Sequence, residues 1–170
     1  MNSESKSRKG GKGMYKKIMV PLDGSKLAEC VFPHLDSLVK GGQVGEVVFV
    51  RVVEPYNFSL MSGEELPKAE DILRLDAEAR AGGEQYVQTV ADRAKSNGVT
   101  VRGEILIGRP SVKLAEYAND GGFDLVIIAT HGRSGVARWV WGSVADKILR
   151  GARVPVLMIR APGMGTNTAV

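Results

Sequence analysis

A loop rich in glycine and polar residues lies in the final third of the chain, after a short apolar run at 124–128. Residues 129–135 read Ala-Thr-His-Gly-Arg-Ser-Gly, and a Gly-Ser pair stands just before a helix-like segment at 144–150. Small residues let backbone N–H groups approach an anion, and the first turn of a helix adds unpaired donors and a favourable dipole. The layout therefore predicts a phosphate-binding loop, with an ordinary glycine-rich connection as the alternative. It is not a Walker A motif, because no Gly-Lys-Ser/Thr follows the glycines.

A second candidate site residue is Asp23, which directly follows the first apolar run, at 18–22. Ligands of open α/β sheets bind at the carboxyl ends of the strands, where the winding direction reverses. For the strand order 3-2-1-4-5 this point lies between the first and fourth strands, so Asp23 would lie beside Ala129 and His131. An aspartate there can accept hydrogen bonds from ribose hydroxyls or from an adenine amino group. Two separate segments are thus predicted to converge on a pocket with the chemistry of a nucleotide site.

Five apolar, β-branched runs separated by helix-like segments predict the scaffold that must hold these residues. The second run is apolar without alternation, as expected of a strand buried on both faces. Strands are expected at 18–22, 46–53, 99–107, 124–128 and 154–159, and helices between Ser25 and Gly41 and at 68–97, 110–119 and 144–150. The alternation predicts an α/β fold, namely a single-domain, open, parallel five-stranded sheet with helices on both faces.

Prolines and glycines predict interruptions in these elements. Pro33, inside the first helical pattern, predicts a kink or a break near Val31–Phe32. A Gly-Gly pair at 82–83 predicts a bend or a break in the segment 68–97 and leaves open whether that segment is one helix or two. Pro155 has no N–H for the sheet, so the last strand is expected to lie at an edge or to start at this residue.

Composition places the chain among single-domain globular proteins. It has 170 residues, of which 44% are hydrophobic, and one cysteine, Cys30, which excludes an internal disulfide. No apolar run approaches the roughly 20 residues of a membrane span. These features favour the cytoplasm as the location.

The net charge of +4 is unevenly distributed. Six lysines and arginines against one glutamate give residues 1–17 a charge of +5, which leaves −1 for the rest of the chain. We therefore expect residues 1–14 to be a disordered basic tail, residues 15–160 to form the folded domain and residues 161–170 to be a flexible tail. Nucleic-acid binding is not expected of the folded part and would be confined to the basic tail.

Four segments together resemble the universal stress protein family. They are Val-Pro-Leu-Asp-Gly-Ser at 20–25, the loop at 129–135, the helix start at 142–147 and the run at 154–159, in the family's order and spacing. The resemblance covers nearly the whole chain and implies a Rossmann-like, adenine nucleotide alpha hydrolase-like sheet in the order 3-2-1-4-5. It also implies a homodimer formed through strand 154–159 and an adenine nucleotide, ATP or AMP, as the ligand.

The family's ATP-binding signature is Gly-x2-Gly-x9-Gly-Ser/Thr. Gly132, Gly142 and Ser143 match it, whereas Ala129 replaces the first glycine and would be strained in a left-handed turn. The residues that the resemblance implies in nucleotide binding are Pro21, Leu22, Asp23, Val52, Ala129, His131, Gly132, Arg133, Gly142, Ser143 and Val144. Asp23 and the backbone of Val52 would contact ribose and adenine, and Ser143 would also face a nucleotide-bound Mg²⁺. His131 has no acidic partner nearby in sequence, so we interpret it as shaping the loop or touching the ligand, not as a base.

Three functions are compatible with these features. The first is a nucleotide-binding stress-response switch or sensor with slow or no ATP hydrolysis, because no catalytic base, Walker-type lysine or metal triad is evident. The second is an ATP-independent dimeric binding module, which Ala129 favours. The third is an ATP pyrophosphatase of a related fold, which would need a Ser-Gly-Gly-x-Asp-Ser loop where this chain has Asp-Gly-Ser at 23–25.

Overall fold

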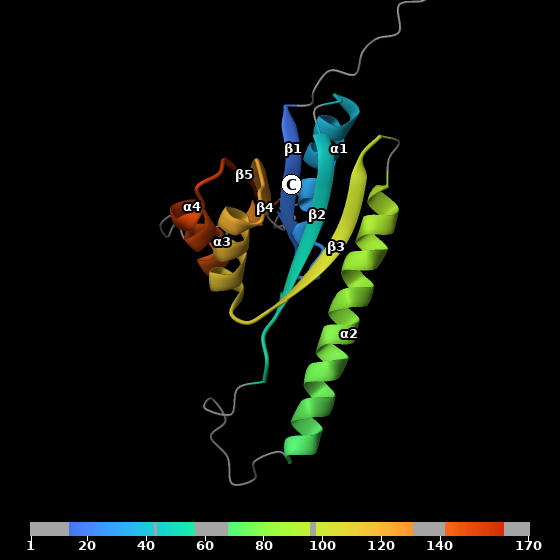
Figure 1. Cartoon of the computed structure of the whole chain (residues 1–170), viewed down its shortest axis with the longest axis vertical. Coiled ribbons are helices and arrows are strands. Elements are labelled where there is room, and N and C mark those ends of the chain that lie inside the picture. The colour runs from blue at the N-terminus through green and yellow to red at the C-terminus, as the bar shows by residue number, and fades with distance from the viewer. Residues whose placement is uncertain (1–13, 43, 57–67, 96–97, 131–141, 162–170) are drawn as a thin grey trace, which may run out of the picture.

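The protein is built around one parallel sheet whose strands follow the order β3-β2-β1-β4-β5 (Figure 1). The computed structural model describes residues 14–42, 44–56, 68–95, 98–130 and 142–161. The strands are β1 (Tyr15–Pro21), β2 (Val44–Val53), β3 (Thr100–Ile107), β4 (Leu125–Thr130) and β5 (Val156–Arg160). The helices are a 3₁₀ turn η1 (Ala28–Val31), α1 (Phe32–Lys40), α2 (Ala69–Ala94), α3 (Pro110–Asp120) and α4 (Ser143–Gly151). The predicted fold class, strand order and alternation are confirmed.

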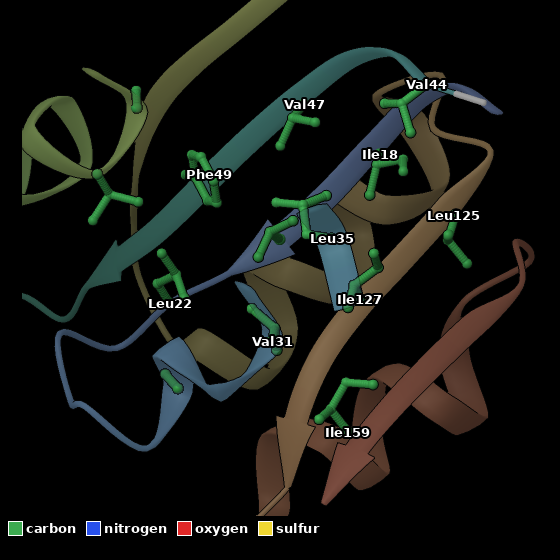
Figure 2. Close-up of a cluster of buried hydrophobic side chains, with 14 residues drawn as sticks. Ile18, Leu22, Val31, Leu35, Val44, Val47, Phe49, Leu125, Ile127 and Ile159 are labelled. Atoms are coloured by element: carbon green, nitrogen blue, oxygen red, sulfur yellow. The ribbon is translucent and has the colours of Figure 1, made fainter. Parts of the chain in front are cut away.

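Two apolar cores, one on each face of the sheet, hold the layers together. Successive residues of a strand point to opposite faces, so Ile18 and Val20 pack toward η1, α1 and α2, whereas Met19 packs toward α3 and α4. Figure 2 shows the first of these cores, in which Leu35 of α1 and Phe49 of β2 are almost fully buried. Burying one such side chain stabilises the fold by about 1.5–3 kcal/mol. The helices therefore cover both faces, as predicted.

The first helical segment is divided where Pro33 predicts a break. The 3₁₀ turn η1 ends at Val31, and α1 begins at Phe32 with Pro33 in its first turn. A proline costs no hydrogen bond there, because the first N–H groups of a helix have no partner within it. The prediction of a break near Val31–Phe32 is confirmed.

Helix α2 runs unbroken for 26 residues through Gly82 and Gly83. The segment therefore holds one helix, and of the expected bend or break, the break is wrong. A Cβ on Gly83 would stand 3.1 Å from Ile105 Cδ1 and 3.2 Å from Val53 Cγ2, whereas a Cβ on Gly82 would meet nothing within 4 Å. Gly83 thus lets the helix lie close against β2 and β3. The lack of a side chain at Gly83 allows α2 to pack closely against the sheet, and this glycine does not mark the end of a helix.

The chain's last described strand lies at an edge of the sheet. β5 pairs only with β4 among the described strands and begins at Val156, directly after Pro155. The Pro155 carbonyl still accepts the N–H of Val126 at 2.9 Å. The prediction from Pro155 is confirmed. The two expected tails lie outside the described residues, apart from Met14 and Ala161.

Within the described ranges, none of the helices combines the length and the apolar character that crossing a membrane requires.

Candidate functional site

A cavity of about 250 Å³ opens at the carboxyl edge of the sheet, where β1 and β4 lie side by side. Its walls come from the ends of β1, β2 and β4, from the turn after β1, and from the first turns of α3 and α4. Residues expected at a site from the sequence line it at eight positions: Pro21, Leu22, Asp23, Val52, Ala129, Gly142, Ser143 and Val144. The other described lining residues are Leu27, Ala28, Pro110, Leu114, Ile128, Thr130, Ala145 and Ala161.

The turn after β1 presents Asp23 at the mouth of this cavity. Leu22 is still bound to the sheet, because its N–H donates to the Val50 carbonyl at 2.8 Å. The chain then reverses through Gly24, whose φ of +88° favours glycine. One carboxylate oxygen of Asp23 accepts the N–H of Ser25 at 2.8 Å, which orients the side chain and leaves acceptor capacity free.

On the opposite wall, α4 points its first turn into the cavity. Asp146 is the first residue of the helix whose N–H bonds to a preceding carbonyl, that of Gly142, at 2.9 Å. The N–H groups of Ser143, Val144 and Ala145 therefore have no partner in the helix. No side chain among the described residues caps this turn at Gly142. Small residues here leave backbone donors accessible to an anion.

Ala129 occupies an ordinary strand position, so the strain expected there does not arise. It lies inside β4 and pairs with Ile159 of β5, which requires extended backbone of the kind alanine adopts readily. The next residue also stays in the ladder, since the Thr130 carbonyl accepts the N–H of Ala161 at 2.9 Å. A left-handed turn at residue 129 is not part of this structure.

The described lining is largely apolar, and Asp23 is its one charged side chain. Polar atoms come otherwise from the hydroxyls of Thr130 and Ser143 and from the backbone. Such a lining suits a flat heterocycle held by a few directed polar groups. In the described part of the chain, the structure contains no group of three or more His, Cys, Asp or Glu side chains that could hold a metal ion.

Sequence reasoning missed the contribution of Leu27, Pro110 and Leu114. Pro110 was expected to start a helix, but not to line the site. A signal was present, because α3 follows β3 and the carboxyl ends of parallel strands share one edge. Three expected site residues, His131, Gly132 and Arg133, lie outside the described residues.

Comparison with known proteins now identifies the family. The sequence model described as the Universal stress protein family matches residues 14–160. The chain belongs to the universal stress protein family.

Individual members support this assignment. Universal stress protein MJ0531 of Methanocaldococcus jannaschii is 31% identical over 155 residues, which are 91% of this chain and 87% of that protein. The structure of MJ0577, from the same organism, superposes with a TM-score of 0.72 at 23% identity and covers 88% of this chain and 99% of its own. A universal stress protein family protein from Arabidopsis thaliana, solved with AMP bound, has a TM-score of 0.60 at 16% identity over 90% of this chain and 96% of its own. At these identities the two structures establish a shared universal stress protein fold.

Proposed function

We propose that this universal stress protein holds an adenine nucleotide, ATP or AMP, in the cavity between β1 and β4 and works as a ligand-dependent switch or sensor. The observation that carries the proposal is the meeting of Asp23, the end of β2 at Val52 and the open first turn of α4 around one apolar cavity. The AMP bound to the Arabidopsis relative supports an adenine nucleotide as the ligand class.

The described residues fit the parts of such a ligand. The apolar wall near Leu27 and Leu114 would cover the base, and the backbone of Val52 would face its edge. Asp23 would accept a hydrogen bond from a ribose hydroxyl. The N–H groups of Ser143 and Val144 would bind phosphate oxygens, aided by the helix dipole. The carboxylate of Asp23 repels phosphate, which favours this orientation over the reverse.

Binding and release fit this cavity better than rapid chemistry. Asp23 is the one titratable side chain among the described lining residues, and it is exposed to solvent. An exposed carboxylate on a turn is well placed to accept a hydrogen bond from a bound ligand, which is a binding role. We expect ATP hydrolysis to be slow or absent. Turnover faster than about 1 s⁻¹, the low end of ordinary enzymes, would contradict the proposal.

The direct test is calorimetry with ATP and AMP on the purified protein, together with mass spectrometry of whatever co-purifies with it. Asp23→Ala should weaken ATP binding about ten- to hundredfold, the usual effect of losing a hydrogen bond to a charged group. Asp36→Ala removes an exposed aspartate of α1 that does not line the cavity, and it should leave the affinity unchanged. Equal losses in the two variants would show that the effect is nonspecific.

Magnesium would enter this site with the nucleotide. The Ser143 hydroxyl lies where it could face an ion bound to the phosphates. If it does, EDTA should weaken ATP binding in the wild type and have less effect in Ser143→Ala. An equal effect of EDTA in both proteins would remove Ser143 from the role.

A second candidate is an ATP-independent dimeric binding module. The largely apolar described lining and the anionic Asp23 side chain favour it, because both suit an uncharged ligand better than a polyphosphate. This candidate predicts no calorimetric heat with ATP or AMP and no co-purifying nucleotide, together with an intact dimer.

A further inference from the structure

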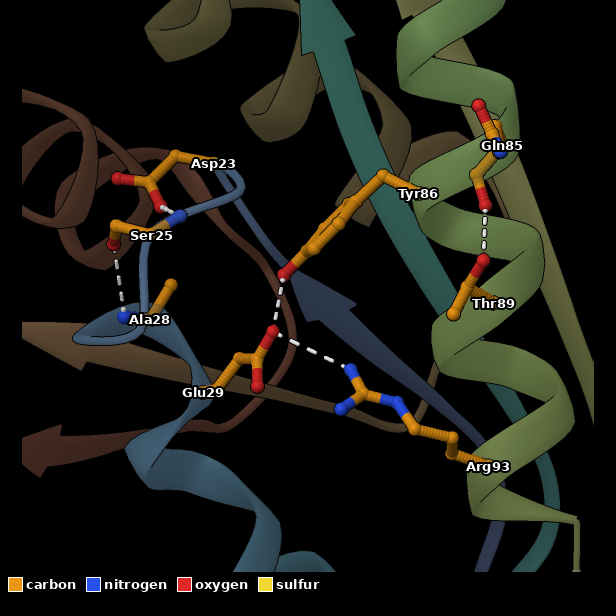
Figure 3. Close-up of polar contacts among 8 residues, drawn as sticks. All are labelled: Asp23, Ser25, Ala28, Glu29, Gln85, Tyr86, Thr89 and Arg93. Carbon is orange, nitrogen blue, oxygen red and sulfur yellow. Dashed lines mark hydrogen bonds and ion pairs between the residues drawn. The ribbon is translucent and has the colours of Figure 1, made fainter.

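The turn that carries Asp23 is tied to η1 by a short chain of hydrogen bonds. Asp23 accepts the N–H of Ser25 at 2.8 Å, and the Ser25 hydroxyl accepts the N–H of Ala28 at 3.1 Å. Ala28 opens η1 and also lines the cavity. The position of the Asp23 carboxylate therefore depends on where η1 stands (Figure 3).

The next residue, Glu29, connects η1 to the long helix α2. Its Oε1 accepts the Tyr86 hydroxyl at 3.1 Å and lies 3.4 Å from a guanidinium nitrogen of Arg93 (Figure 3). The Arg93 side chain is 57% exposed, whereas that of Glu29 is 25% exposed. An exposed ion pair contributes little, so the bond from Tyr86 is the firmer of the two. Burial, followed by this bond to Glu29, raises the pKa of Tyr86 to about 12, and the phenol stays a donor at neutral pH.

Arg51 of β2 lies close to the same turn. Its guanidinium lies 5.4 Å from the centre of the Tyr86 ring. One of its nitrogens is 3.0 Å from where a Cβ on Gly24 would stand. Arg51 is also the sequence neighbour of Val52, which lines the cavity. The Tyr86 side chain thus contacts both Glu29, which follows Ala28, and Arg51, which lies close to Gly24.

We infer that Tyr86 is a positioning residue of the nucleotide site, acting through Glu29 and η1 to hold Asp23 in place for the ligand. The inference rests on the proposed function and deepens it, because it couples the ligand to α2. A change at the surface of α2 that moves Tyr86 would alter the affinity of the cavity, and ligand binding would in turn tighten α2 against η1.

Tyr86→Phe tests this, since it removes the hydroxyl and keeps the ring beneath Arg51. We expect ATP to bind about three- to tenfold more weakly, the range for one lost hydrogen bond. In an Asp23→Ala background the same substitution should have no further effect, because it acts through Asp23. An equal loss in both backgrounds would mean a purely structural role and would overturn the inference.

Tyr117→Phe is the matched control. The Tyr117 hydroxyl also donates to a glutamate, Glu104, but Tyr117 packs with the other core and does not line the cavity. We expect its ATP affinity to equal that of the wild type. A loss as large as that of Tyr86→Phe would overturn the assignment of a specific role to Tyr86.

NMR measurements on the ligand-free protein distinguish a failure of this inference from a failure of the proposed function. In amide NMR spectra without nucleotide, Tyr86→Phe should shift the Ser25 and Ala28 resonances, and Tyr117→Phe should not. Unchanged resonances in Tyr86→Phe would overturn the positioning role, even if the wild type binds ATP. Shifted resonances in a protein that binds neither ATP nor AMP would support the mechanical link and contradict the proposed function.

Discussion

Asp23, which follows β1, and Ala129, inside β4, both line the cavity, and they contribute in different ways. Asp23 lies on a turn and presents its carboxylate to the cavity, whereas Ala129 lies in a strand and contributes a small side chain to the cavity wall. A ligand could come close to the backbone at residue 129 only if the side chain there is small, but the backbone does not need a positive φ. The replacement of a signature glycine by alanine is therefore conservative in this protein.

Ala129→Gly would restore the full family signature, yet we expect it not to improve ATP binding. Glycine in the middle of a strand is less stable than alanine by about 0.5–1 kcal/mol, so the free energy of unfolding should fall by that amount. Urea unfolding and calorimetry with ATP would measure both. A clear gain in affinity would contradict the strand geometry assigned to residue 129.

Tyr86 should make stability depend on alkaline pH. Its pKa is about 10 in the unfolded chain and is raised to about 12 in the fold, first by burial and then by the bond to Glu29. The folded state keeps the proton longer, so the contribution is fully present below pH 10 and is lost as the pH rises to about 12. Urea unfolding at pH 9–12 should show a steeper decline for the wild type than for Tyr86→Phe. Equal declines of the free energy of unfolding in the two proteins would contradict this role of the Tyr86 proton.

At the scale of the elements, α2 lies close to the sheet because two glycines remove side chains from the contact. Gly83 faces β2 and β3 from the helix, and a Cβ on Gly103 of β3 would stand 2.8 Å from backbone and side-chain atoms of Val87. This close approach brings Tyr86 within reach of both Glu29 and Arg51. The packing of α2 and the geometry at Asp23 therefore depend on the same contact.

Gly82→Ala and Gly83→Ala should differ in stability although they are neighbours. Alanine is favoured over glycine in a helix by about 1 kcal/mol, and Gly82 has open space to accept a Cβ. At Gly83 the new Cβ would crowd Ile105 and Val53, at 3.1 and 3.2 Å. We expect Gly82→Ala to raise the free energy of unfolding by up to about 1 kcal/mol. Gly83→Ala should raise it by less or lower it. Equal gains in urea unfolding would show that α2 is not close-packed at Gly83.

These contacts also mark how far sequence reasoning reaches. The alternation of strands and helices predicts the parallel α/β sheet, because both patterns are local, whereas the strand order comes from the resemblance to the universal stress protein family and is confirmed by the structure. The contact of Gly83 with Ile105 joins residues far apart in the sequence, so a glycine from which the sequence predicts a bend or a break is in fact a packing residue. Leu114 could not be assigned to the site from the sequence either, because an apolar side chain fits a hydrophobic core as well as a cavity wall. Asp23 could be placed at the site because it directly follows a strand end.

Over the whole molecule, β5 is an edge strand among the described strands and pairs there with β4 alone. Leu157 of β5 and Leu149 of α4 are partly exposed apolar side chains near this edge, at 38% and 44%. An unpaired strand edge with apolar side chains favours pairing with another chain. We propose a homodimer through this strand.

Leu157→Glu should convert that dimer to a monomer, as measured by light scattering. Leu157 is a better choice than Ile159, which is 8% exposed and part of the core, so that a charge there would unfold the protein. Leu73→Glu is the control, because Leu73 is 70% exposed and belongs to α2, which lies away from β5 (Figure 1). A dimer that survives Leu157→Glu would place the interface elsewhere.

The pairing of β1 with β4, described above as the frame of the cavity, has a consequence for how the protein is made. Ile18 and Met19 leave the ribosome long before their partners Leu125 and Val126, roughly 5–20 s earlier at ordinary translation rates. The two walls of the cavity thus meet only after β4 has been synthesised. A nucleotide bound there would stabilise chains that already contain β4 and give no help to shorter nascent chains, so the ligand would act on folding only after that point.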